Sequence, residues 1–280
     1  MKIYDVIILG AGASGLMCAA NLPSKKTVAL LDVNEKVAKK LKISGGGKCN
    51  VTNANVSLEN FDGDKELIDY ALKKFSKDDL LKFLDRNGVP LELRKNRYYF
   101  CQNSSDEIIN ALKRGAKNAE LTLNGEILEV VKREDVFEVK TSKGVLNARN
   151  VVVATGGKSY TTLGASEVGL EIAKSFGLKV KEFTPALVGL TLQKEQFWMK
   201  ELSGLSCYVN VRVEDRLIKE EMLFAHKGVS GPAILSASLY WKKGLISVDF
   251  LPDTNMAEFA GGGKKLVSSV IPLAKRLSKA

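Results

Sequence analysis

Three glycines near the start of the sequence, Gly10, Gly12 and Gly15, have the GxGxxG spacing of a dinucleotide-binding turn. They follow the apolar residues 6–9, so the sequence predicts a buried strand, a glycine-rich turn and a helix in that order. The free N–H groups and positive dipole end of such a helix can bind a pyrophosphate. Asp32 ends the predicted second strand, where a carboxylate can accept a hydrogen bond from a ribose hydroxyl. Together these features favour dinucleotide binding over a glycine turn with only a structural role.

Hydrophobic periodicity predicts the elements that position these residues. A helix over residues 13–22 and a strand over 27–31 complete a β-α-β unit within residues 1–32. Alternation between residues 121 and 145, with breaks at 124–125, 134–135 and 143–144, predicts a β-meander. Further helices are predicted at 67–75 and at 167–176, and two more begin at the capping-box patterns Ser76/Asp79 and Ser104/Glu107. Further strands are predicted at 151–153, 187–192, 208–213, 217–224 and 245–250. Residues 261–265 indicate a linker, and residues 266–277 a helix.

The overall composition is that of an ordinary globular protein. The 280 residues allow one large or two small domains, and their net charge of +10 comes mainly from lysines scattered along the chain. Because no basic run is interleaved with aromatics, we expect a solvated surface rather than a nucleic-acid partner. No apolar run approaches the ~20 residues needed to cross a bilayer. With no signal-peptide pattern either, we expect a cytoplasmic protein without a membrane partner.

The cysteines and the histidine argue against a metal site. The four cysteines, at positions 18, 49, 101 and 207, show neither a CxxC motif nor metal-ligand spacing. Free thiols are therefore expected in a reducing compartment. The presence of a single histidine, His226, argues against a histidine-based metal site.

A second small-residue segment distinguishes between cofactors. Ala154, Thr155, Gly156 and Gly157 follow the predicted meander and return strand. A nicotinamide dehydrogenase does not need this arrangement, whereas large FAD folds return a strand of small residues to the dinucleotide. Ala19, four residues after Gly15, is also small where the first helix packs on the sheet. The sequence therefore predicts FAD.

Four segments, at residues 41–53, 151–169, 185–192 and 223–235, resemble the YhiN/BaiN-type family of bacterial NAD(P)/FAD-dependent oxidoreductases, which includes aminoacetone oxidase-like flavoproteins and bile-acid enone reductases. The resemblance implies an α/β fold: a glutathione-reductase-like FAD-binding Rossmann domain with a β-meander, plus an inserted β-rich, barrel-like substrate domain. It implies an FAD-binding domain at 1–186, the β-rich domain at 187–252 and the start of a helical segment at 253–280. Relatives continue well beyond residue 280, so the return segment of the FAD domain is expected to be absent, which favours homo-oligomerisation.

The resemblance also implies which residues hold FAD. The pyrophosphate is expected at the first glycine turn, the adenosine beside Asp32 and the meander, and the flavin along the second glycine-rich loop. The implied residues are Gly10, Gly12, Ala13, Ser14, Gly15, Asp32, Val33, Asn34, Ser44, Gly45, Gly46, Gly47, Lys48, Cys49, Asn50, Ile127, Ala154, Thr155, Gly156, Gly157 and Tyr160.

Catalytic residues are less well specified. His226 is a weak candidate for donating a proton to the substrate after hydride transfer, against the alternative of a packed histidine. Cys49 lacks a nearby cysteine in the sequence, so we expect a small buried residue near the flavin rather than a redox thiol. Lys48 pairs with a phosphate or flavin oxygen, or is a solvated lysine at a loop edge.

The expected function is therefore an FAD-dependent oxidoreductase that passes a hydride between the flavin and a small organic substrate. There is no second GxGxxG motif, so NAD(P)H, if it is the donor, must dock transiently. Otherwise an amine or a reduced organic substrate is the hydride donor and oxygen is the acceptor. Two alternatives stay open: a short, non-catalytic flavin-binding or scaffold form, and a flavoprotein that acts on RNA.

Overall fold

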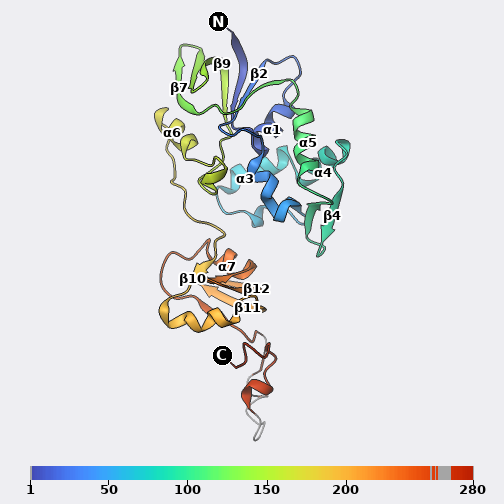
Figure 1. Cartoon of the computed structure of the whole chain (residues 1–280), viewed down its shortest axis with the longest axis vertical. Helices are drawn as coiled ribbons and strands as arrows, with labels where there is room; N and C mark the ends of the chain where they lie inside the picture. Colours follow the sequence, from blue (N-terminus) through green and yellow to red (C-terminus); the bar gives the residue numbers. More distant parts are fainter. Residues whose placement is uncertain (1, 253, 256, 258–265, 280) are drawn as a thin grey trace. The chain divides into compact units, whose positions relative to one another are not determined.

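The computed structural model describes residues 2–252, 254–255, 257 and 266–279 (Figure 1). It divides into two compact units, Met1–Glu182 and Phe183–Ala280. This boundary lies four residues before the position 186 expected from the sequence. Each unit has its own sheets and its own buried hydrophobic residues.

The first unit is built on a six-stranded sheet in the order β6-β2-β1-β9-β8-β7. Strands β6, β2, β1 and β9 run parallel, whereas β7, β8 and β9 form an antiparallel meander. The bounds are β1 Ile3–Leu9, β2 Val28–Leu31, β6 Ala119–Thr122, β7 Ile127–Arg133, β8 Val136–Thr141 and β9 Gly144–Val153. All four residues of β2 are buried, as expected for a parallel strand covered on both faces. The predicted α/β class is confirmed.

The meander differs from the prediction in two ways. Residue 121 lies in β6, which pairs parallel with β2 instead of joining the meander. The last meander strand and the predicted return strand are one continuous strand, β9, which pairs with β1 from Ile3↔Asn147 to Leu9↔Val153. Because this ladder continues along β1 after the meander ends, β9 delivers residues 154–157 directly beside the first glycine turn.

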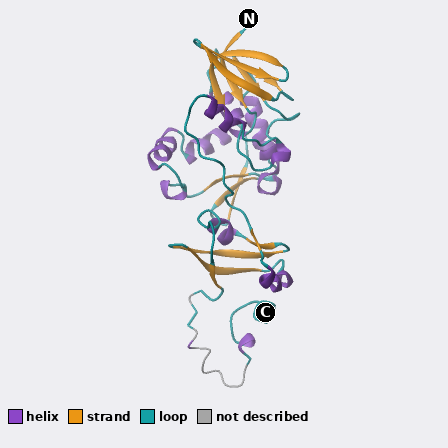
Figure 2. Ribbon diagram, turned by 90° about the vertical axis from the view of Figure 1, so that its left-hand side faces the viewer, coloured by secondary structure: helices purple, strands orange, loops and turns teal. Residues whose placement is uncertain are grey.

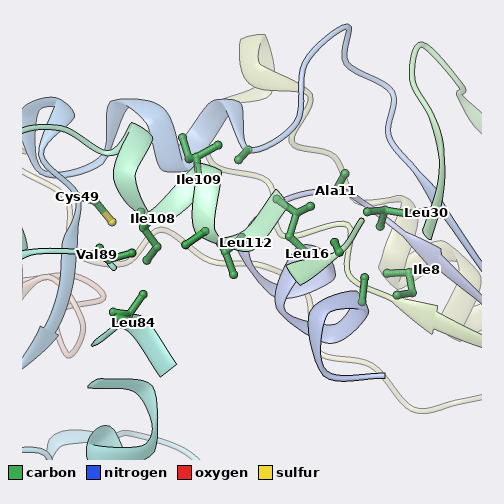
Figure 3. Packing of buried hydrophobic residues seen from close by; sticks show 14 of the residues in the cluster. Ile8, Ala11, Leu16, Leu30, Cys49, Leu84, Val89, Ile108, Ile109 and Leu112 are labelled. Atoms are coloured by element: carbon green, nitrogen blue, oxygen red, sulfur yellow. The ribbon is translucent and has the colours of Figure 1, made fainter. Parts of the chain in front are cut away.

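Helices pack against both faces of the sheet. Figure 2 shows the strands of this sheet next to the group of helices in the same unit. On one face, α1 (Ala13–Asn21) and α5 (Asp106–Gly115) pack over inward residues of β1 and β2. Figure 3 shows Leu16 of α1 between Leu112 of α5 and Ile8 and Leu30 of the sheet. On the other face, Ile172 of α6 (Val168–Ser175) joins a cluster with Ile7 and meander residues. The remaining helical segments of this unit are α2 Lys39–Ile43, η1 Ser44–Gly47, η2 Leu58–Asn60, α3 Lys65–Lys74, α4 Lys77–Arg86 and η3 Thr161–Leu163.

The two predicted capping boxes have different outcomes. At α4 the box is formed: Ser76 and Asp79 satisfy each other's backbone N–H groups. At α5 the N-cap is Ser105 instead of Ser104. Ser105 is buried and its Oγ donates to the carbonyl of Lys42, so this residue anchors the helix start to α2.

A small antiparallel sheet, β3-β5-β4, was not predicted from the sequence. Its strands are β3 Asn50–Asn53, β4 Leu91–Arg94 and β5 Tyr98–Cys101. β3 follows η1 directly, and the N–H of Cys101 donates to the carbonyl of Lys48 at 2.9 Å. This sheet therefore extends from the second glycine-rich loop.

The second unit contains a five-stranded antiparallel sheet in the order β10-β13-β12-β11-β14. The bounds are η4 Lys194–Leu202, β10 Leu190–Thr191, β11 Ser206–Val213, β12 Arg216–Ala225, β13 Gly228–Ser230, α7 Pro232–Ala237 and β14 Ser247–Asp249. Residues of α7 pack on Val209, Val211 and Phe224 of the sheet. The predicted β-rich region is thus present, although the strands at 187–192 and 245–250 are shorter than expected.

The helix predicted at 266–277 is not formed. The structure has a single short 3-10 helix, η5 (Val267–Ser269), followed by turns. Pro272 gives the physical reason, because it lacks an N–H and disfavours helical geometry in the residue before it. The predicted linker at 261–265 lies outside the described residues. None of the helices within the described ranges is both long and apolar enough to cross a membrane.

Candidate functional site

A cavity of about 610 Å³ lies in the first unit, at the carboxyl ends of β1, β2 and β9. This edge is where α/β sheets bind their ligands. Most of the residues implied for FAD line it: Gly10, Gly12, Ala13, Ser14, Asp32, Val33, Asn34, Ser44, Ile127, Ala154, Thr155, Gly156 and Gly157. The structure thus brings together residues from five separate stretches of the sequence, at 10–14, 32–34, 44, 127 and 154–157.

The three glycines of the first turn have separate roles. Gly10 has a φ of +106°, and a Cβ there would lie 2.4 Å from the carbonyl oxygen of Ala154. A Cβ on Gly15 would lie 1.8 Å from the carbonyl oxygen of Gly10. At Gly12, by contrast, no atom of the described chain lies within 4 Å of the Cβ position. Gly10 and Gly15 therefore permit close backbone packing, whereas Gly12 leaves space on the cavity side.

The N-terminus of α1 provides hydrogen-bond donors to this space. Gly12 is its N-cap, and no side chain in the described part of the chain caps it. The first turn contains no acidic residue. The first N–H groups of a helix have no partner within the helix, and together with the dipole they favour an anion. Backbone donors and space coincide at Gly12, as a bound diphosphate requires.

Asp32 links the end of β2 to the glycine turn. Its Oδ2 accepts the N–H of Ala11 at 2.7 Å, and its Oδ1 accepts the backbone N–H of Asn34 at 2.8 Å and the side-chain amide of Asn34 at 2.9 Å. A carboxylate has about four lone-pair sites. Asp32 is half-buried at the cavity wall, so acceptor capacity for a ribose hydroxyl remains after these bonds.

One part of the wall was missed by the sequence analysis. Leu163, Gly164, Ala165 and Ser166 line the cavity, and the side-chain amide of Asn34 donates to the carbonyl of Leu163 at 3.0 Å. A Cβ on Gly164 would lie 2.5 Å from that amide nitrogen. Gly164, which closely follows residues 154–157, was the sequence feature that could have indicated this wall. The cavity lining also includes residues that were not predicted as site residues: Leu31, Ala38, Lys39, Lys40, Leu41, Glu126 and Val168.

The second glycine-rich loop lies mostly beside the cavity lining. Ser44 lines the cavity, whereas Gly45, Gly46, Gly47, Lys48, Cys49 and Asn50 do not. Gly45 and Gly46 adopt left-handed conformations, with φ of +56° and +66°. No described atom lies within 4 Å of a Cβ built on Gly46 or Gly47. The loop is open at these glycines, as the approach of a flat ring would require, and the Nζ of Lys48 donates to the carbonyl of Gln102 at 3.3 Å.

Cys49 has a cysteine neighbour that the sequence analysis did not identify. Cys49 and Cys101 are both buried, and each thiol influences the pKa of the other, because β5 runs back alongside the start of β3. Burial, followed by the nearby Cys49, raises the pKa of Cys101 to about 11. Burial also raises the pKa of Cys49, against hydrogen bonds from Ser44 and Cys101 that lower it. Both thiols are therefore protonated at neutral pH, which argues against a reactive thiolate.

The three remaining predicted residues, Gly15, Tyr160 and His226, lie outside the cavity lining. Tyr160 is 60% exposed, with the Lys40 ammonium 5.5 Å from its ring centroid. His226 lies in the second unit, in the exposed turn between β12 and β13, where its Nδ1 is 3.1 Å from Ser203 Oγ. The described ranges contain no group of His, Cys, Asp and Glu residues that could hold a metal ion.

The cavity fits the ADP half of FAD. The α1 N-terminus with Gly12, Ala13 and Ser14 would hold the pyrophosphate, and Asp32 the adenosine ribose. Residues 154–157 would contact the dinucleotide from β9. When bound, FAD supplies a ring that accepts and passes on a hydride.

Comparisons with known proteins give a consistent result. A model of the HI0933-like protein Rossmann domain matches residues 4–263. The chain is 33% identical over 266 residues to the ribosomal RNA dihydrouridine synthase of Escherichia coli (strain K12), covering 92% of this chain and 66% of that protein. It is 31% identical over 262 residues to the protein of the same name from Haemophilus influenzae, covering 90% and 65%. The chain therefore spans just under two thirds of the length of these relatives.

A third relative has a different name. The chain is 26% identical over 267 residues to the 3-dehydro-bile acid delta(4,6)-reductase of Clostridium scindens, covering 90% of this chain and 65% of that protein. Among solved structures, it is similar to the open conformation of a flavocytochrome c3 fumarate reductase, with 17% identity and a TM-score of 0.49 over 74% of this chain and 47% of the other.

Proposed function

Because this chain belongs to the HI0933-like Rossmann family of FAD-dependent oxidoreductases, we propose that it reduces the C5=C6 bond of a uracil base in ribosomal RNA. The observation that carries the flavin part is the cavity at Gly12, where space and helix N–H donors coincide. The names of the relatives that are 33% and 31% identical support the substrate part. This proposal adopts the RNA alternative in place of the free small molecule first expected.

The names of the relatives describe related chemistry. Dihydrouridine differs from uridine by two hydrogens across C5 and C6, a bond conjugated with the C4 carbonyl. The name of the bile-acid reductase likewise describes reduction of ring double bonds conjugated with a ketone. Such a bond takes a hydride at the carbon remote from the carbonyl and a proton at the adjacent carbon. A flavin is suited to supplying the hydride.

We further propose NADH or NADPH as the source of the electrons. The nucleotide would deliver its hydride to the flavin and leave before the RNA binds, because the chain has no second GxGxxG motif to hold it permanently. Each cycle then oxidises one NADH or NADPH, takes up one proton and forms one dihydrouridine. The proton donor is not assigned: the sequence offers His226 only as a weak candidate, with a packed histidine as the alternative.

The direct test uses the chain loaded with FAD and mixed anaerobically with NADH or NADPH and with ribosomal RNA that lacks dihydrouridine. Nucleosides from digested RNA are analysed by mass spectrometry for the two-dalton gain of dihydrouridine. We expect one dihydrouridine for each nicotinamide oxidised. Reduction of the flavin without any dihydrouridine would overturn the RNA substrate, and turnover of a small cyclic enone alone would replace it. A chain that never retains FAD would favour the scaffold alternative.

A further inference from the structure

The hairpin formed by β4 and β5 combines cations and aromatics in a way the flavin site does not require. The end of β4 and the connection to β5 contain Arg94, Lys95 and Arg97 within four residues, followed directly by Tyr98, Tyr99 and Phe100. This run corrects the expectation that no basic segment is interleaved with aromatics. It is the pattern found where proteins hold single-stranded nucleic acids.

The hairpin geometry places these side chains at an exposed tip. Strand pairing ends at Arg94↔Tyr98, so residues 95–97 form the connection. Lys95 and Asn96 both have φ of +49°, which turns the chain tightly, and Lys95, Asn96 and Arg97 are exposed. The cations at the tip are therefore accessible to a large partner.

The aromatic rings lie under guanidinium groups on one face of the sheet. The register pairs Arg94 with Tyr98 and Glu92 with Phe100, and directly paired residues share a face. The guanidinium carbon of Arg94 is 4.7 Å from the Phe100 ring centroid, and that of Arg97 is 5.1 Å from the Tyr98 centroid. Tyr98 and Phe100 are half-buried, so part of each ring is accessible. Planar cations and rings together form surfaces on which bases can stack.

The charge on this hairpin is mostly positive. Residues 91–100 contain three cationic side chains and a single acid, Glu92. Glu92 forms an ion pair with Arg94 at 2.8 Å, which keeps that guanidinium over Phe100. The acid therefore orients the Arg94 guanidinium.

The hairpin is anchored to the loop beside the FAD cavity. A Cβ on Gly45 would lie 2.8 Å from the Phe100 ring, so the loop packs against that aromatic. The N–H of Ala54, just after β3, donates to the carbonyl of Arg97 at 2.7 Å. A partner held by the hairpin is thus attached to the same loop whose first residue, Ser44, lines the cavity.

We propose that the hairpin face, defined as Arg94, Lys95, Arg97, Tyr98 and Phe100, binds a single-stranded segment of the RNA substrate. Lys95 and Arg97 contact phosphates, and a base stacks on Tyr98 beside the guanidinium of Arg97. This inference rests on the proposed function for the identity of the partner. It adds a binding surface for that RNA outside the FAD cavity.

The test measures binding of a fluorescent, uridine-rich single-stranded oligoribonucleotide at several salt concentrations. The double variant Lys95→Gln/Arg97→Gln removes two charges from exposed positions, and Lys25→Gln/Lys117→Gln removes two from exposed positions outside the hairpin. Each phosphate contact to single-stranded nucleic acid contributes about 0.7 to the salt slope, so the hairpin variant is expected to lower the slope by about 1.4. We expect about tenfold weaker binding for the hairpin variant and unchanged binding for the control.

Tyr98 separates stacking from charge. Tyr98→Leu is expected to weaken binding about tenfold without changing the salt slope, and Tyr98→Phe is expected to restore it, since stacking on an aromatic ring is sequence-tolerant. FAD content, followed by absorbance near 450 nm, should be the same in all variants, so folding and cofactor binding are controlled. Equal binding of single strands and perfect duplexes would overturn the stacking role.

Failure of the hairpin face as an RNA-binding surface can be distinguished from failure of the proposed reaction. If the hairpin variant binds the oligonucleotide as tightly as the unmodified chain, the hairpin face is overturned even where dihydrouridine forms. If binding depends on the hairpin but no dihydrouridine is made, the surface stands and the proposed reaction is overturned. Absence of any RNA binding by the unmodified chain overturns the hairpin face outright.

Discussion

The backbone N–H of Ala11 donates a 2.7 Å hydrogen bond to Oδ2 of Asp32. This bond ties the glycine turn after β1 to the acid after β2, so the residue expected to bind the ribose also shapes the turn expected to bind the pyrophosphate. Two parts of the dinucleotide site are therefore set by one side chain.

Asp32→Ala is expected to weaken FAD binding by about 10- to 100-fold, because a hydrogen bond to a charged group contributes roughly 1.5–3 kcal/mol. Titration of the protein with FAD, followed by quenching of flavin fluorescence, measures the change. Asp5→Ala is the matched control: Asp5 accepts the N–H of Thr27 at 2.9 Å, at the opposite end of β1 and β2. It should lower stability and leave FAD affinity unchanged, and an equal loss of affinity in both variants would contradict the role of Asp32.

The glycines at 12 and 15 should respond differently to the same added methyl group. At Gly15 a Cβ would meet the carbonyl oxygen of Gly10, so Gly15→Ala should lower the midpoint of thermal unfolding of the apoprotein by several degrees. Gly12→Ala has no such contact within the described chain and should leave that midpoint nearly unchanged while weakening FAD binding at least tenfold. Tight FAD binding by a folded Gly12→Ala protein would show that the pyrophosphate lies elsewhere.

The buried thiols predict a loss of stability at alkaline pH. The pKa of Cys101 is raised to about 11 in the folded protein, against an ordinary value near 9, chiefly by burial. The unfolded chain therefore ionises first, and the stability contributed by the protonated thiol is present below pH 9 and is lost as pH rises toward 11. Urea unfolding between pH 8 and 11 should show this decline, and it should be shallower in Cys101→Ala. An identical pH dependence in that variant would contradict it.

Substitution of His226 tests whether this residue donates the proton to the substrate. If it donates the proton, His226→Asn should lower turnover by 10²–10⁴-fold, the usual contribution of a general acid. Reduction of the flavin by the nicotinamide should stay unchanged, which stopped-flow absorbance at 450 nm reports. Ser203→Ala removes the neighbour of Nδ1 and should have a smaller effect. Unchanged turnover in His226→Asn would remove this residue as a candidate.

The parts of the fold predicted from the sequence are those encoded locally. The first strand, glycine turn and helix lie within about twenty residues, and their hydrophobic pattern and glycine spacing report the backbone geometry directly. Helix α4 is similarly specified by Ser76 and Asp79 at its start. Local signals placed both correctly.

The missed features depend on pairing between distant segments. Cys49 meets Cys101 because β3 and β5 pair, and neither short strand has a clear alternating pattern. The wall at Leu163 is fixed by its hydrogen bond to Asn34, more than a hundred residues away. The continuous β9 was divided in the prediction; its first half pairs with β8 and its second half with β1. No single-segment signal encodes these relationships.

The most direct test of the central claim, that the cavity at Gly12 is an FAD site, is the flavin retained by the chain. The purified protein is incubated with FAD, passed through gel filtration and measured near 450 nm and 280 nm, in parallel with Gly12→Ala. We predict close to one flavin per chain for the unmodified protein and little for the variant, with both equally folded by circular dichroism. Retention of no flavin by the folded, unmodified chain would contradict the account.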